Sequence, residues 1–391
     1  MALRFDLIVI GSGPAGAAAA TCAAGNGLRV ALIDRHRFPR NKLCGGGVTG
    51  RGAAAAGSIL GRELPDGLLE PRRSFEFHAH GRMLARLDDA PAMFMTTRMG
   101  LDAHLHATAL DAGAQDFSGR KIAALDPLGP GLRLATGETL SAPLMIGADG
   151  VNSATARALF GRAFEDGTVG LALEIEAPPP ATTDMAVRID FAAADWGYGW
   201  RFPKSGSTTV GVGGLHRRNP DMKRQMRCYI ETPGLDPAGQ RVQGHFMPFG
   251  AFRRTPGKGP VLLAGDAAGL VDPITGEGIA YALQSGALAA RAAVEALARG
   301  RPETALPRYR ESLAPIHLSL VQARAIRLAI FTPALREGFL RAFRRSDRLR
   351  HDYMRMLAGE LEYGDIARGL LWRLPKLAAH SLAGGLGLAR G

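Results

Sequence analysis

The amino-terminal glycines have the types and spacing needed to bind a diphosphate. Residues 5–20 read FDLIVIGSGPAGAAAA, an apolar run rich in β-forming residues, then a glycine turn, then an alanine-rich helix former. Gly11 permits the tight turn, Gly13 lets the backbone approach a ligand, and Gly16 lets the helix pack on the strand. The amides that begin the helix, including that of Ala15, would point at the diphosphate.

An acidic residue follows at the distance that a dinucleotide site requires. The segment LRVALID ends in Asp34, 18 residues after Gly16. At the end of a second strand, such a carboxylate hydrogen-bonds the adenosine ribose and would repel a 2′-phosphate. We include its neighbour Arg35 among the candidate cofactor contacts. The alternative is a glycine-rich turn in an ordinary βαβ unit.

In a third segment, an acidic residue follows a strand and a helix begins at a glycine. The strand VLLAG ends in Gly265 and Asp266, and twelve residues later Gly278 and Ile279 begin a helix. A chain that binds a diphosphate and then returns in this way fits a long dinucleotide, FAD. Asp266 would hold the ribityl hydroxyls, and the helix-start amides would face the flavin ring. The helix dipole there would stabilise the anion of reduced flavin.

These segments resemble a known superfamily. GSGPAG, GADG (residues 147–150) and GDAAGLVDPITGEGI are similar to the FAD domain of the p-hydroxybenzoate hydroxylase-like flavoproteins, over roughly the first 300 residues. Within that superfamily, KLCGGGVT (residues 42–49) and YGWRFPK (residues 198–204) resemble segments of the geranylgeranyl reductase family, the second being similar to its YxWxFP signature.

The resemblance implies roles for further residues. In the family, a Cys-Gly pair, here Cys44 and Gly45, lies in the flavin loop, and the aromatic segment lines the substrate cavity. Arg98 corresponds to an arginine that contacts FAD, Ile122 to an adenine-side backbone contact, and Asp149 to a site that contacts flavin and nicotinamide. The substrate-binding residues implied are Trp200, Phe202 and Pro203.

Structural roles for these residues stay open. Arg98 can serve as a salt-bridge partner at a helix start, and Asp149 as a turn former. Trp200 and Phe202 lie on one face of a strand, where core packing is the commonest role of aromatic side chains.

The resemblance implies reduction of C=C bonds in a geranylgeranyl or polyprenyl chain. Reducing an isolated alkene requires a proton and a hydride. The hydride would come from FAD reduced by NADPH, NADH or a small electron carrier, and Trp200 could stabilise developing positive charge. Cys44 and Tyr198 both carry a proton at neutral pH, so either could be the acid, and geometry must decide.

Rival functions share parts of this pattern. An aromatic hydroxylase, a monooxygenase of the same superfamily, uses the same FAD anchors. Flavin-dependent halogenases carry WxWxIP, from which Tyr198 and Phe202 depart. A quinone reductase with an iron–sulfur cluster needs clustered cysteines, whereas Cys22, Cys44 and Cys228 are scattered. A non-catalytic flavin-binding membrane adaptor would have little use for the cysteine loop.

Composition indicates a globular protein with a basic end. The 391 residues are 46% hydrophobic and 21% charged, with net charge +12. Residues 301–391 hold 16 Lys and Arg against 8 Asp and Glu. A basic tail suits an anionic surface, and no nucleic-acid module or metal site accompanies it. We expect no disulfide and no membrane span. The expected location is the cytoplasm, with peripheral attachment to the inner face of the cell membrane as an open alternative. The sequence leaves the oligomeric state open.

The predicted fold class is α/β, α+β overall. A Rossmann-like FAD domain is interleaved with an antiparallel-sheet substrate domain and followed by a helical segment. The FAD domain takes residues 1–72, 96–165 and 255–300; the substrate domain takes residues 73–95 and 166–254; residues 301–391 form the helical region.

Arginines alternate with apolar residues near the carboxyl terminus. Over residues 334–357 the apolar positions include Leu335, Phe339, Phe343 and Leu357, at mostly helical spacing among seven arginines. The pattern predicts a basic amphipathic helix that lies on an anionic membrane. The alternative is a helix that covers the substrate domain and leaves its arginines in water.

Overall fold

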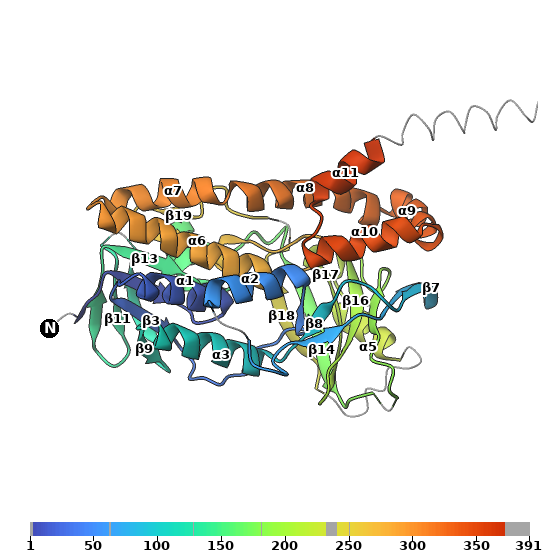
Figure 1. Ribbon diagram of the computed structural model, residues 1–391, viewed down its shortest axis with the longest axis horizontal. Coiled ribbons are helices and arrows are strands. Elements are labelled where there is room, and N and C mark those ends of the chain that lie inside the picture. Colours follow the sequence, from blue (N-terminus) through green and yellow to red (C-terminus); the bar gives the residue numbers. More distant parts are fainter. Residues whose placement is uncertain are drawn as a thin grey trace, which may run out of the picture.

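The computed structural model describes residues 3–61, 64–127, 129–180, 182–231, 241–249 and 251–371. Figure 1 shows a parallel sheet with its helices on the left, a second sheet at the lower right, and the later helices along the top. This arrangement confirms the predicted fold class of an interleaved α/β layer, a second sheet and a helical carboxyl-terminal region.

The parallel sheet forms the floor under the amino-terminal glycines. Its inner strands are almost wholly apolar and buried, as expected for a parallel sheet that is covered on both faces. All pairs are parallel except that of β19 with β20. In spatial order the strands are β19 (Gly257–Lys258), β20 (Val261–Leu263), β13 (Leu144–Gly147), β2 (Leu7–Ile10), β3 (Val30–Asp34) and β9 (Gln115–Ser118).

Helix α1 (Pro14–Gly25) packs against α6 (Ile279–Ala298) and α3 (Arg98–Asp111). The contact with α6 is very close: a Cβ at Gly286 would lie 2.0 Å from the carbonyl oxygen of Ala15. The small side chains of both helices permit this approach. Two further helices complete this part, α2 (Gly50–Leu60) and α4 (Ala154–Phe160).

The second sheet combines strands from both parts of the predicted substrate domain. Neighbours are antiparallel except β15 and β6, which run parallel because β6 comes from the earlier insertion. The β6–β7 turn has positive φ at His80 and Gly81, 50° and 72°, as two-residue hairpins require. In spatial order the strands are β18 (Gln243–Met247), β14 (Gly170–Ala177), β17 (Thr208–Leu215), β16 (Gly197–Pro203), β15 (Val187–Asp190), β6 (Phe75–Ala79) and β7 (Arg82–Leu87).

The two faces of this sheet have different neighbours. Helix α5 (Met222–Ile230) covers one face, packing on the apolar side chains of β14 and β17. The other face carries Trp200 and Phe202, which join a core shared with the carboxyl-terminal helices. Side chains at alternate positions of β14 therefore point either to α5 or to the interior between the layers.

Short elements link the layers. One small sheet has the order β1 (Leu3–Arg4), β12 (Thr139–Ser141), β11 (Gly131–Leu134) and β10 (Ile122–Asp126). Another has the order β4 (Gly47–Val48), β8 (Met93–Met95) and β5 (Glu70–Arg72). The 3-10 helices are η1 (His216–Arg218), η2 (Gly265–Ala268) and η3 (Pro302–Thr304).

The carboxyl-terminal helices correct one prediction. The expected single helix over residues 334–357 is wrong, because the chain is extended at Ser346, whose hydroxyl accepts the Leu349 N–H at 3.2 Å and begins a new helix. Phe343 and Leu357 are buried in the shared core, so this segment does cover the second sheet. The helices are α7 (Ala305–Ser312), α8 (Ala314–Phe331), α9 (Pro333–Arg345), α10 (Asp347–Ala358) and α11 (Tyr363–Leu371).

The described residues contain no single helix with the length and apolar composition needed to cross a bilayer. One bent pair, Pro302–Ser312 with Ala314–Phe331, meets both criteria by length and composition.

Candidate active site

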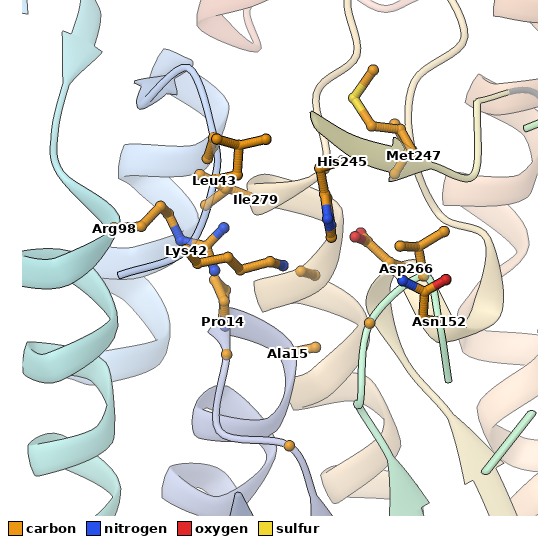
Figure 2. A pocket seen from close by; sticks show the side chains of 18 of the residues that line it. Pro14, Ala15, Lys42, Leu43, Arg98, Asn152, His245, Met247, Asp266 and Ile279 are labelled. Atoms are coloured by element: carbon orange, nitrogen blue, oxygen red, sulfur yellow. The ribbon is translucent and has the colours of Figure 1, made fainter. Parts of the chain in front are cut away.

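A cavity of about 900 Å³ lies between the two layers. It reaches from the end of β3 to the aromatic residues of β16. Figure 2 shows part of its wall, where the start of α1 at Pro14 and Ala15 faces Lys42, His245 and Asp266. The volume is that of a site for a large organic ligand.

The amino-terminal turn has the backbone that a diphosphate needs. Gly11 has φ +94°, and a Cβ there would lie 2.4 Å from the carbonyl oxygen of Ala148. Gly13 caps α1 and lines the cavity, and a Cβ there would meet no protein atom closer than 3.7 Å. The space beside Gly13 is therefore free for a ligand at the positive end of α1.

Asp34 lies where a ribose would bind, at the end of β3. Its two carboxylate oxygens accept the backbone N–H groups of Ser12, at 2.9 Å, and His36, at 2.8 Å. These bonds orient a carboxylate that also lines the cavity, as Arg35 does. Ile122 lines the same end of the cavity.

The third segment reaches the opposite side of this cavity. Asp266 follows β20 and points into it (Figure 2). Gly278 is the amino-terminal cap of α6, with Ile279 its first residue, and no side chain caps them. Gly278 and Ile279 line the cavity beside Asp266, where the amides at the start of α6 would stabilise a ring with developing negative charge.

Arg98 belongs to a buried cationic cluster. It is the first residue of α3 and donates two 2.7 Å hydrogen bonds to Asp102, whose carboxylate also pairs with Arg40 at 2.9 Å. Both arginines line the cavity. Arg98 therefore forms an ion pair at the start of α3 and is also placed where it could contact a ligand. Burial, and then the nearby Arg98 cation, lowers the pKa of Lys42.

Asp149, like Arg98, has a structural contact and also lines the cavity. Its carboxylate accepts bonds from the Ser153 hydroxyl, at 2.5 Å, and the Thr155 N–H, at 3.0 Å, at the start of α4. It also lines the cavity. Asp149 therefore has the turn-forming role, and its contact with the cofactor stays a prediction.

The cysteine loop lies over the second sheet. Cys44 and Gly45 line the cavity, and the Cys44 N–H donates a 2.8 Å bond to the buried carboxyl of Glu174 on β14. A Cβ on Gly45 would come within 3.0 Å of the Trp200 indole nitrogen. The loop therefore packs directly on the aromatic segment.

The aromatic segment divides into lining and supporting residues. Tyr198, Trp200 and Phe202 line the cavity. The Tyr198 hydroxyl donates to the Thr275 carbonyl oxygen, and burial raises the Tyr198 pKa above its usual range. The proton of Tyr198 is therefore strongly held, which weakens its case as an acid.

Three predicted site residues lie outside the cavity wall. Gly16 packs on the Gly11 carbonyl, Gly265 has φ +59° and donates its N–H to the Ser285 hydroxyl, and the Pro203 carbonyl accepts a bond from Arg72. They shape the backbone next to residues that line the cavity. Their predicted direct contacts with cofactor or substrate stay predictions.

The residues present fit FAD. One continuous wall contains two helix amino termini and, towards each end of the cavity, an acidic residue that follows a strand. It also contains glycines at positions where a Cβ would intrude. Three buried nitrogens in that wall have no protein partner: Arg40 Nε, Trp200 Nε1 and His245 Nε2. Buried polar nitrogens without protein partners suit a polar ligand that offers hydrogen-bonding groups of its own.

Several charged residues in the wall or directly behind it were not predicted. Asp102 lies four residues after Arg98, a spacing that signals an ion pair. Glu277 accepts the Thr49 hydroxyl, and burial raises its pKa to about 7. Glu174 alternates with Glu176 on β14, a pattern typical of a solvent-facing strand edge, so its burial carries no sequence signal.

Replacing Asp266 with alanine should weaken FAD binding. A charge-assisted hydrogen bond contributes about 1.5–3 kcal/mol, so the dissociation constant should rise roughly 10- to 100-fold. Equilibrium dialysis measures it, with Asp89→Ala as the control because Asp89 is exposed and outside the cavity wall. Equal FAD affinity in the wild type and Asp266→Ala would exclude this carboxylate as a ligand.

Known proteins are similar to this chain in sequence and in fold. The family model described as FAD dependent oxidoreductase matches residues 6–157. The chain is 32% identical over 309 residues to a menaquinone reductase of Mycobacterium tuberculosis, covering 73% of this chain and 75% of the relative. It is 32% identical over 319 residues to the geranylgeranyl diphosphate reductase of Rhodobacter capsulatus, covering 77% and 78%.

A solved structure agrees in fold. The geranylgeranyl bacteriochlorophyll reductase-like protein of Thermoplasma acidophilum superposes with a TM-score of 0.75, covering 86% of this chain and 91% of that one at 22% identity. The superposed share, 86% of the chain, is much larger than the segment of residues 6–157 that the family model matches.

Proposed function

Because the chain belongs to the geranylgeranyl reductase family of FAD-dependent oxidoreductases, we propose that it hydrogenates C=C bonds of a geranylgeranyl or longer polyprenyl chain. Bound FAD, once reduced, supplies the hydride. NADPH, NADH or a small reduced carrier supplies the electrons.

The observation that carries this proposal is the change in the cavity wall along its length. At one end the wall is built from helix amino termini and strand-end acids. At the other it is built from apolar side chains of β8, the second sheet and α10: Met93, Ile189, Trp200, Phe202, Met247, Tyr353 and Leu357. An apolar end next to the flavin end suits an isoprenoid and excludes water from it.

The chain's own residues have distinct parts in this reaction. Trp200, 6% exposed, presents an aromatic face that stabilises positive charge developing on the alkene. Phe202 packs against the cysteine loop, with its ring 3.1 Å from where a Cβ on Gly45 would lie, and so fixes the position of Cys44. Cys44 stays a candidate acid.

Two measurements test the function. Acid precipitation of the purified protein should release FAD, since no covalent-attachment motif is recognised in the sequence. Anaerobic titration with NADPH and NADH, followed by mass spectrometry after adding geranylgeranyl diphosphate, a chlorophyll-type ester or a prenylquinone, should show two hydrogens gained per saturated bond. A colourless protein that FAD cannot reconstitute, or an oxygen-dependent hydroxylated product, would overturn the proposal.

We also propose that the protein docks on an anionic membrane, the source of a prenyl substrate. Arg341, Arg344, Arg345 and Arg348 of α9 and α10 are exposed. Four apolar side chains of α8 and α9 are about half exposed: Leu318, Val321, Leu328 and Leu335. Basic and apolar side chains together suit a lipid interface, and Tyr353 and Leu357 of α10 reach from this region to the cavity.

In vesicle flotation, the protein should bind anionic vesicles at low salt. Each basic residue near the surface contributes on the order of 1 kcal/mol, and salt screens this attraction. Changing Arg344 and Arg345 to glutamine should weaken binding, whereas Arg301→Gln is the control, because this exposed arginine precedes η3 and lies outside α9 and α10. Equal binding to neutral vesicles, or none at low salt, would contradict electrostatic docking.

A further inference from the structure

A buried carboxyl lies under the cysteine loop. Glu174 is 5% exposed, and β14 places it on the face of the sheet that lines the cavity. Its Oε1 accepts the Cys44 N–H at 2.8 Å. The residue opposite it on β17 is Gly211, and a Cβ on Gly211 would come within 2.4 Å of the Trp200 ring. Glu174 is thus flanked by the two residues that the proposed reaction uses.

The charges around Glu174 leave it able to hold a proton. Burial raises its pKa to about 7, and the Glu176 carboxylate raises it, while the Cys44 N–H and the cations Lys204 and Arg98 lower it. The residues opposite on the neighbouring strands, Gly211 and Gln243, do not titrate.

A polar cluster leads from this carboxyl towards solvent. Glu176, the next residue on the same face of β14, has a half-exposed side chain. Its Oε1 accepts from buried Lys204 Nζ at 2.9 Å, and its Oε2 accepts from the Thr209 hydroxyl at 2.8 Å. Lys204 also donates to Thr209 at 2.5 Å. These groups lie near Glu174 and include a half-exposed carboxylate, so a proton route through them would leave the apolar end of the cavity closed.

We propose that Glu174 is the acid that supplies the proton for alkene reduction, recharged from solvent through Glu176, Lys204 and Thr209. The assignment rests on the proposed function. The carboxyl O–H bond breaks, the π electrons of the alkene form one new C–H bond with that proton, and hydride from reduced FAD forms the second. The carboxylate left behind takes a proton from water through the cluster, so one H⁺ and one H⁻ are consumed for each bond reduced.

The first test separates the two half-reactions. Glu174→Gln keeps an oxygen for the Cys44 N–H and removes the acid, so FAD binding and its reduction by the donor should stay near wild type. Prenyl saturation should slow by roughly 100-fold or more, as for loss of a general acid. Glu174→Asp should recover part of the rate, and exposed Glu295→Gln is the control.

The pH dependence has a definite sign. A general acid acts only when protonated, so the wild-type saturation rate should fall as pH rises through about 7. This fall should be absent in Glu174→Gln and present in Cys44→Ser. If Cys44→Ser instead abolishes it, or if Glu174→Gln saturates its substrate at the wild-type rate, the assignment is wrong.

A further readout does not depend on turnover. Infrared difference spectra of the FAD-loaded protein should show carboxyl deprotonation near pH 7, part of which disappears in Glu174→Gln and another part in Glu277→Gln. A signal unchanged by Glu174→Gln would contradict a protonated Glu174. If the wild type saturates no prenyl substrate, the proposed function itself has failed, which is distinct from a variant-specific result.

Discussion

Gly16→Ala should abolish FAD retention and leave little folded protein. A Cβ at this position would lie 1.7 Å from the carbonyl oxygen of Gly11 and 2.8 Å from its carbonyl carbon. Both are backbone atoms of the tight turn, so no side-chain rotation relieves the contact. Inserting a methyl group into a packed site costs about 1–3 kcal/mol, and more where backbone must move. Expression yield, thermal unfolding and flavin content measure the effect.

Two other glycines separate folding from cofactor binding. Gly57→Ala on α2 meets no atom within 4 Å, so it should leave both properties intact. Gly13→Ala clashes with no protein atom but enters the ligand space, so it should fold and bind FAD roughly 10- to 100-fold more weakly. Wild-type FAD content in Gly16→Ala would show that the turn does not set the diphosphate site.

Asp102→Ala should destabilise the protein by about 3–5 kcal/mol, because it leaves two arginines without their buried counter-ion. Asp102 is fully buried and pairs with Arg98 and Arg40, whose side chains are 5% and 12% exposed. Urea unfolding gives the free energy. The FAD dissociation constant should also rise, since both guanidinium groups lose the partner that orients them towards the cavity.

An exposed ion pair is the matched control for Asp102. Glu303→Ala removes a carboxylate whose side chain, like that of its partner Arg301, is about two-thirds exposed. That change should cost less than about 1 kcal/mol. Similar losses for Asp102→Ala and Glu303→Ala would show that the Arg98 cluster is not a buried network.

The parallel layer was predictable because its signals are local. The apolar runs around Val9 and Ile146 are short, buried on both faces and followed at once by glycine turns. The hairpin turn at His80 and Gly81 also has a local signal, because glycine readily adopts the positive φ that such a turn requires. The break at Ser346 was not, because a serine inside an arginine-rich helical pattern signals a cap only when tertiary packing turns the chain there.

The site was only partly predictable for a similar reason. Asp34, Asp266 and Gly278 follow strands or begin helices, so spacing places them at one edge of a sheet. Glu174 and Lys204 become chemically important only because the cysteine loop, more than 100 residues away, covers them. Strand alternation alone predicts a solvent-exposed Glu174, and only the burial that this loop provides gives its carboxyl a raised pKa.

The discontinuity of the parallel sheet has a consequence for synthesis on the ribosome. Strand β2 ends at Ile10, its partner β13 begins at Leu144, and β20 begins at Val261. At about 5–20 residues per second, roughly 12–50 s separate the emergence of the first of these strands from that of the last. During that interval the nascent sheet has an unpaired apolar edge, first that of β2 and then that of β13, which is the kind of surface that chaperones bind. The cofactor cannot shorten this exposure, because part of its predicted binding site, from Asp266 to Ile279, is translated only after β20.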